Sequence, residues 1–164
     1  MTERQDAVVI GSGAGGGVMA FELARRGLKV TVVEAGPRWD PTTFEHDEIE
    51  MFARAYKYGG LQGTKDHHTL IVQGGSVGGS TVINNAIWLR ADLERVLASW
   101  AEAGAHVPST ALEAAYTELE GALHVEDLPP ELANRGSNLF LRGCDAVGLR
   151  GHYLRHNRDH CIGC

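Results

Sequence analysis

The chain has 164 residues, 43% of them hydrophobic, and a formal net charge of -6. This length suits one domain with a hydrophobic core and is too short for two comfortable ones. The acidic balance, without a cluster of lysine and arginine, argues against a nucleic-acid-binding surface, and no apolar stretch approaches the roughly 20 residues of a membrane span. Only Met1 to Gln5 precede the first apolar run, which leaves no room for a signal peptide. A cytoplasmic location is therefore expected.

The first stretch, residues 6–34, predicts a strand, a helix and a second strand. Residues 6–10 and 28–33 are short runs rich in valine and isoleucine, typical of parallel strands covered on both faces. Between them the pattern predicts a helix over residues 13–26, which Gly27 ends. Two parallel strands joined by a helix indicate an α/β, Rossmann-like fold.

Three glycines and one carboxylate make this unit a dinucleotide-binding fingerprint. Gly11 permits a tight turn, Gly13 lets the backbone approach a pyrophosphate, and Gly16 lets the helix pack close to the strand. Glu34, at the end of the second strand, can accept both hydroxyls of an adenosine ribose and repels the 2′-phosphate of NADP. These residues leave both NAD and FAD open. The alternative, a merely compact connection, does not explain the spacing of the acid.

The next segment predicts a helix over residues 43–57 that packs on one side and ends at the glycines after Tyr58. His67 and His68 follow on a polar loop before a short apolar run. A metal role would need further ligands, and none is evident nearby, so both histidines are expected to be solvated.

A second glycine-rich stretch spans residues 73–90. Gly78 and Gly79 remove side chains where a flat ring or a phosphate must pass. The hydroxyls and amides that follow offer hydrogen-bond donors: Ser80, Thr81, Asn84 and Asn85. The alternative is a glycine-rich connector between a strand and a helix.

The two motifs, in this order, resemble the N-terminal part of the glucose-methanol-choline oxidoreductase family, whose members use FAD to oxidise alcohols and related substrates. The family's first motif resembles residues 11–16 together with residues 34–36, and its second resembles residues 78–84. The resemblance implies that the cofactor is FAD rather than NAD.

The resemblance also implies which residues bind the cofactor. They are Gly11, Gly13, Ala14, Gly15 and Gly16 at the diphosphate, Glu34 and Ala35 at the adenosine ribose, and Gly78, Gly79, Ser80, Asn84 and Asn85 along the diphosphate and flavin. Some family members attach the flavin through a histidine just before the matching asparagine. This chain has Ile83 there, which predicts dissociable FAD.

Two further helices are predicted as scaffold. Residues 91–104 are amphipathic, with Asp92 as N-cap. A second helix follows Pro108, where Thr110 and Glu113 have the spacing of a capping box.

The C-terminal part predicts a short helix over residues 138–147, broken by Gly143. In the tail, Cys161 and Cys164 have C-x-x-C spacing beside His160. Two thiols do not make a four-ligand site, so reduced structural thiols are expected and no metal site is predicted.

The domain organisation expected from these patterns is one partial FAD-binding domain over residues 1–164. It comprises the βαβ unit of residues 1–36, the second cofactor segment of residues 69–90, and a mainly helical part over residues 91–147. In the family, the catalytic histidine and its partner lie far downstream, with the substrate-binding domain. No catalytic residue is therefore assigned, and the chain is expected to be incomplete, with an incomplete parallel sheet, and inactive alone.

The predicted function is the FAD-binding portion of an oxidoreductase acting on CH–OH groups of alcohols, sugars or sterols, with hydride passing from substrate to flavin N5. The expected partner is a small alcohol-type molecule, with no nucleic acid and no membrane. The alternative is a non-catalytic FAD-binding subunit completed by another chain, such as a separate C-terminal half, with a metal shared across the tail cysteines.

Overall fold

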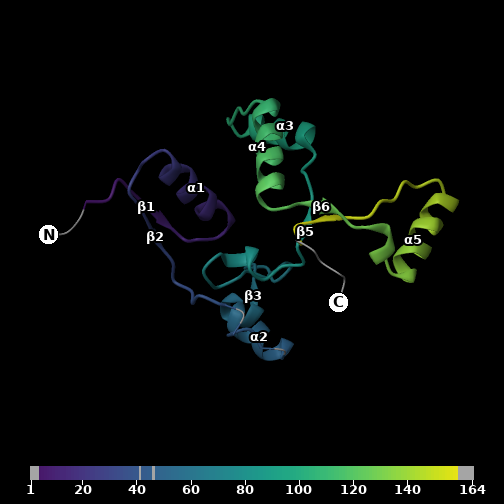
Figure 1. Cartoon of the computed structure of the whole chain (residues 1–164), viewed down its shortest axis with the longest axis horizontal. Coiled ribbons are helices and arrows are strands. Elements are labelled where there is room, and N and C mark those ends of the chain that lie inside the picture. The colour runs from purple at the N-terminus through teal and green to yellow at the C-terminus, as the bar shows by residue number, and fades with distance from the viewer. Residues whose placement is uncertain (1–3, 41, 46, 159–164) are drawn as a thin grey trace. The chain divides into compact units, whose positions relative to one another are not determined.

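The computed structural model describes residues 4–40, 42–45 and 47–158 (Figure 1). The chain divides into two compact units, one ending at Asn84 and the other beginning at Asn85. Within the described ranges, no helix combines the length and apolar character needed to cross a membrane. The predicted tail cysteines and His160 lie outside the described residues.

The first unit opens with the predicted βαβ arrangement. Strand β1 (Ala7–Ile10) and strand β2 (Val30–Val33) pair in parallel along their whole lengths, and helix α1 (Ala14–Arg25) connects them. Gly27, at φ +86°, lies in the left-handed region that favours glycine, which explains why the helix ends there. The prediction of this unit is confirmed.

Helix α1 packs against β1 and β2 through a close backbone approach at Gly16. A Cβ added to this residue would lie 2.0 Å from the carbonyl oxygen of Gly11. Only a glycine fits between the helix and the end of the strand, as the sequence predicts.

Helix α2 (Glu48–Ala55) is shorter than the predicted helix over residues 43–57. The Asp47 side chain accepts hydrogen bonds from the backbone N–H groups of Ile49 and Glu50, both at 3.0 Å, and so fixes the start of the helix. At the other end, Tyr56 is extended. The predicted bounds are therefore wrong at both ends.

Two short strands follow the 3₁₀ turn η1 (Lys57–Gly60). They are β3 (Gln62–Gly63) and β4 (Leu70–Ile71), which pair antiparallel. His67 and His68 lie on the loop between them and are exposed, which confirms that they are solvated. A second 3₁₀ turn, η2 (Gly79–Thr81), lies in the second glycine stretch.

The described part of the second unit contains three helices and a small antiparallel sheet. Its elements, in chain order, are β5 (Ile87–Trp88), α3 (Leu93–Glu102), α4 (Ser109–Ala122), β6 (Glu126–Asp127), the 3₁₀ turn η3 (Pro130–Leu132), α5 (Arg135–Ala146) and β7 (Arg155–His156). Strand β7 lies between β5 and β6 and pairs antiparallel with both.

The predicted N-terminus of α3 is confirmed, whereas that of α4 is wrong. Asp92 accepts a hydrogen bond from the backbone N–H of Arg95 at 3.2 Å. Helix α4 starts at Ser109, directly after an extended Pro108 that makes no side-chain cap. Thr110 therefore lies inside the helix, where it cannot act as the N-cap of a capping box.

The predicted break at Gly143 is also wrong. Helix α5 runs through this residue without interruption, and it begins earlier than predicted because the Asn134 side chain caps the N–H of Ser137 at 2.8 Å. A glycine inside a helix costs only about 1 kcal/mol relative to alanine, which a well-capped helix tolerates.

The described residues bury little apolar surface. Met51 and Ala55 are the buried hydrophobic side chains among them. In β1, Ala7 and Val9 are half-buried while Val8 and Ile10 are exposed, Ile10 by 88%. The expected hydrophobic core is therefore small among the described residues. The prediction of strands covered on both faces is wrong there, because Val8 and Ile10 of β1 are exposed.

Candidate cofactor site

The first unit contains a cavity of about 310 Å³ at the carboxyl ends of β1 and β2. In parallel α/β units this is the edge at which ligands bind. The cavity is lined by Gly11, Gly13, Ala14, Glu34, Lys57, Gln73, Gly74, Ser76, Gly79, Ser80 and Thr81. It therefore brings together the two glycine stretches that the sequence singled out.

The Glu34 carboxylate is held by three hydrogen bonds. Oε1 accepts from the N–H of Gly36 at 2.9 Å. Oε2 accepts from the N–H and the hydroxyl of Ser12, at 2.8 and 2.7 Å. These bonds, led by the one from Gly36, lower the pKa of Glu34 to about 2. The side chain is an anion at neutral pH and retains lone pairs for ribose hydroxyls.

The N-terminal end of α1 lies at the same cavity. Its N-cap residue, Gly13, is extended and makes no side-chain cap, so the N–H groups of the first turn have no capping side chain. Gly11, at φ +86°, turns the chain from β1 into this helix. A helix N-terminus of this kind attracts the charge of a diphosphate.

The second glycine stretch is held against the rest of the unit by backbone hydrogen bonds. The N–H of Lys57 donates to the carbonyl of Gln73, and the N–H of Gly75 donates to the carbonyl of Ala55, both at 2.8 Å. Gly78 and Gly79 have positive φ values of 88° and 57°. These bonds fix one wall of the cavity.

The two glycine stretches touch at Gly79. A Cβ added there would lie 3.1 Å from the Cα of Gly13, which is tighter than most real contacts. Bare backbone on both sides therefore forms this part of the cavity.

Three of the predicted donors form hydrogen bonds with backbone groups in and next to the 3₁₀ turn η2. The Ser80 hydroxyl accepts from the N–H of Gly74 at 3.0 Å, and the Thr81 hydroxyl donates to the carbonyl of Gly78 at 2.6 Å. The Asn84 amide donates to the carbonyls of Ser80 and Thr81, at 3.1 and 2.7 Å. These side chains shape the backbone that faces the cavity.

The structure brings half of the predicted cofactor residues to the cavity wall and not the others. Those at the wall are Gly11, Gly13, Ala14, Glu34, Gly79 and Ser80, and those elsewhere in the first unit are Gly15, Gly16, Ala35, Gly78 and Asn84. Asn85 belongs to the second unit and lines another cavity. Contact of each residue with the cofactor stays a prediction.

Sequence reasoning missed five residues of this site, namely Ser12, Lys57, Gln73, Gly74 and Ser76. Ser12 occupies a position of the glycine motif that accepts any residue. Lys57 is the last residue of the predicted helix over residues 43–57, and Gln73 is the first residue of the second glycine-rich stretch. Ser76 is fully buried at the cavity wall, and its hydroxyl has no hydrogen-bond partner among the described residues. The position of Ser76 between two glycine pairs could have indicated that its hydroxyl lies at the site.

These features fit FAD. The Ser76 hydroxyl is a buried polar group in need of a partner, the helix end suits a diphosphate, and the Glu34 anion suits a ribose. Bare glycine backbone lines the passage between them.

A parallel βαβ unit with a glycine turn, an open helix end and an acid after the second strand defines a dinucleotide-binding protein. Comparison with known families agrees: residues 6–44 match the FAD binding domain and residues 52–164 match GMC oxidoreductase. The chain belongs to the GMC oxidoreductase family. The family assignment supports a Rossmann-like fold with an incomplete sheet, and FAD is the cofactor it indicates.

Known relatives extend over nearly the whole chain. Long-chain-alcohol oxidase FAO4A of Arabidopsis thaliana is 40% identical over 174 residues, which cover 97% of this chain and 23% of that protein. An uncharacterized GMC-type oxidoreductase of Mycobacterium tuberculosis is 33% identical over 166 residues, covering 98% and 26%. Long-chain-alcohol oxidase FAO4B of Arabidopsis thaliana is 32% identical over 167 residues, covering 98% and 22%. The chain thus spans about a quarter of the length of these relatives.

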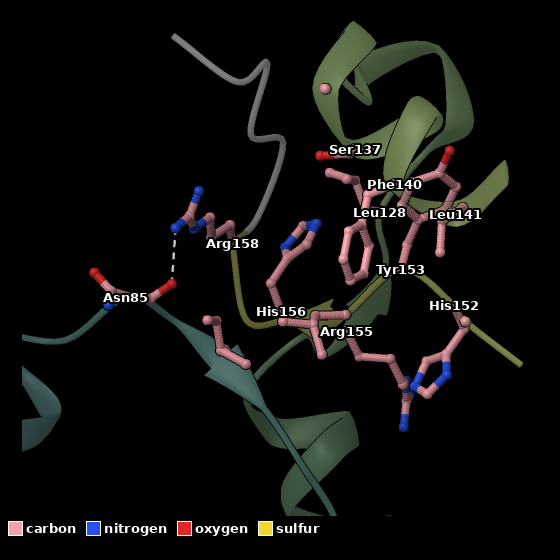
Figure 2. A pocket seen from close by; sticks show the side chains of 14 residues that line it. Asn85, Leu128, Ser137, Phe140, Leu141, His152, Tyr153, Arg155, His156 and Arg158 are labelled. Carbon is pink, nitrogen blue, oxygen red and sulfur yellow. Dashed lines mark hydrogen bonds between the residues drawn. The ribbon is translucent and has the colours of Figure 1, made fainter. Parts of the chain in front are cut away.

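The second unit has a cavity of its own, of about 650 Å³ (Figure 2). Phe140, Leu141 and Leu128 supply apolar walls, and His156 and Arg158 supply polar ones. Among the described residues, no group of three or more metal-ligating side chains is present.

Proposed function

We propose that this chain is the FAD-binding portion of a flavin-dependent oxidoreductase that acts on CH–OH groups of alcohols, sugars or sterols. The observation that carries the proposal is the cavity in which the Glu34 anion, the α1 N-terminus and the second glycine stretch converge. The relatives named alcohol oxidases support the alcohol class, and they favour an enzyme over the alternative of a non-catalytic subunit.

The chain's own residues have binding and orienting roles in this proposal. The Glu34 carboxylate accepts the ribose hydroxyls, and the first-turn N–H groups of α1 face the diphosphate. Gly13 and Gly79 let the backbone approach the cofactor closely, and Ser76 donates or accepts one buried hydrogen bond. When bound, FAD supplies the acceptor for the substrate hydride. The group that accepts the hydroxyl proton is not assigned within these residues.

Titration of the complete gene product with FAD tests the proposal. The change in flavin fluorescence should saturate as FAD binds. Glu34→Gln should weaken FAD binding about 10-fold or more, because the ribose hydroxyls lose a charged hydrogen-bond acceptor. Glu48→Gln, at the first turn of α2, is the matched control and should leave the affinity unchanged. An alcohol should then bleach the flavin absorbance. A purified protein that binds no FAD would contradict the proposal.

A further inference from the structure

Ser12 connects the two halves of the cofactor cavity. Its hydroxyl donates to Glu34 Oε2 at 2.7 Å and accepts from the N–H of Gly78 at 2.9 Å. Gly78 is 66 residues further along the chain. One side chain therefore ties the dinucleotide turn to the second glycine stretch.

The direction of both hydrogen bonds is fixed by chemistry. A carboxylate only accepts and a backbone N–H only donates, so the Ser12 proton must point at Glu34 and its lone pair at Gly78. The hydrogen bond from Ser12 also restricts the orientation of the Glu34 carboxylate, which would otherwise rotate more freely. Gly78, which donates the second hydrogen bond to Ser12, lies in the left-handed region at φ +88°.

We propose that Ser12 is a positioning residue that preorganises the cofactor site by locking Glu34 and the second glycine stretch in one arrangement before FAD binds. A preorganised site loses less conformational freedom on binding and so binds more tightly. This inference rests on the proposed function.

Ser12→Ala and Ser12→Cys test the role by FAD titration of the complete gene product. Both variants should weaken binding about 10-fold, whereas Ser12→Thr, which keeps the hydroxyl, should restore most of the affinity. Ser99→Ala, at an exposed position of α3, is the matched control and should leave the FAD affinity unchanged. Thermal unfolding without FAD checks that each variant is folded.

Two further readouts separate positioning from general stability. In a Glu34→Gln background the added effect of Ser12→Ala should shrink, because the two residues act as a unit. In Ser12→Ala alone, loss of one hydrogen bond to the carboxylate raises the pKa of Glu34, so FAD affinity should begin to fall at a higher pH during acidification. If the wild type binds FAD and Ser12→Ala binds it equally well, the inference is wrong while the proposed function stands. If the wild type binds no FAD, the proposed function itself fails.

The cavity of the second unit contains a buried histidine, His156. His156 is 7% exposed, and neither ring nitrogen has a hydrogen-bond partner among the residues that the structure describes. Figure 2 shows its ring between Arg158 and Phe140. A buried imidazole without partners is costly, and a ligand that hydrogen-bonds it removes that cost.

The charge of this cavity favours an anion. Among the described residues, its wall carries the arginines Arg155 and Arg158 and no carboxylate. Glu120 neutralises Arg155 at 2.8 Å. Arg158 donates to the carbonyl of Asn85 at 2.7 Å and has no carboxylate partner in the described part of the chain. The rest of the wall includes the apolar side chains of Phe140 and Leu141.

We infer that this cavity binds an amphiphile with an acidic head group, the head at His156 and Arg158 and the hydrocarbon along Phe140 and Leu141. The volume of about 650 Å³ lies in the range of small-molecule sites. This inference does not depend on FAD.

Calorimetric titration of the complete gene product with sodium decanoate, below its micelle concentration, tests the site. Saturable binding is expected, and Arg158→Gln should weaken it about 10-fold, because a charged hydrogen bond is lost. Arg150→Gln, at an exposed position outside the cavity, is the matched control. Decyl phosphate distinguishes a phosphate head from a carboxylate head, and decanol should bind without responding to Arg158→Gln. No saturable binding of either acid, or equal binding by Arg158→Gln, would overturn the inference.

Discussion

Replacement of Gly16 by alanine tests whether the helix end is built as described. The added Cβ would lie 2.0 Å from the carbonyl oxygen and 3.0 Å from the carbonyl carbon of Gly11. Real Cβ atoms essentially never come closer than 3.0 Å, so α1 must move away from β1. The contact atoms are backbone and cannot rotate aside. Gly16→Ala should lower the free energy of unfolding by about 1–3 kcal/mol, the usual cost of overpacking, and should weaken FAD binding.

Gly17→Ala is the matched control in the same helix. Its Cβ would meet the carbonyl oxygen of Ser12 at 3.6 Å, an ordinary contact. Alanine is favoured over glycine inside a helix by about 1 kcal/mol, so this variant should be as stable as the wild type or more so. Urea unfolding with and without FAD measures both variants. Equal stability and equal FAD affinity of Gly16→Ala and Gly17→Ala would refute the close packing of α1 on β1.

Three further outcomes are expected. Asp47→Ala should lower the free energy of unfolding by about 1 kcal/mol, because it removes the N-cap of α2, as urea unfolding can measure. The pKa of Glu120 is lowered to about 2, first by its hydrogen bond with Arg90, so its stabilising effect is present above the ordinary value of 4.5 and is lost as the pH falls toward 2; denaturant unfolding between pH 7 and 3 should show a shallower loss in Glu120→Gln than in the wild type. Acid precipitation should release FAD into the supernatant, because Ile83 offers no histidine for covalent attachment; flavin retained in the pellet would contradict this.

The sequence predicts β1, α1 and β2 well because their signals are local. A valine-rich run, a glycine turn and an acid at fixed spacing specify the unit without help from distant residues. The small sheet of the second unit has no such pattern. Its strands are two residues long, and β7 pairs with β5 and β6 across many intervening residues. Alternation cannot be recognised over two residues.

Helix ends are predicted less well because several residues compete to begin a helix. Asp92 caps α3 as expected, but Asp47 rather than Thr43 sets the start of α2, and Pro108 displaces the expected capping box of α4. Each of these side chains can satisfy backbone groups locally, and tertiary packing chooses among them.

The sequence singles out several residues that the structure gathers at one cavity, and their contact with FAD stays a prediction. Glu34 and the glycines follow from known spacing. Ser80 and Asn84, which were expected to donate to the cofactor, also form hydrogen bonds with nearby backbone groups, because a tight turn leaves its N–H and C=O groups in need of partners. Their contact with the cofactor stays a prediction. Ser12 was missed because its importance arises from Gly78, which only the folded chain brings to it.

The most direct test of the central claim is the visible absorbance spectrum of the complete gene product, purified without added cofactor and then titrated with FAD. We expect flavin bands that correspond to one bound FAD per chain, that weaken in Glu34→Gln, and that bleach when an alcohol is added. A folded protein that carries no flavin absorbance after unbound FAD has been removed by gel filtration would contradict this.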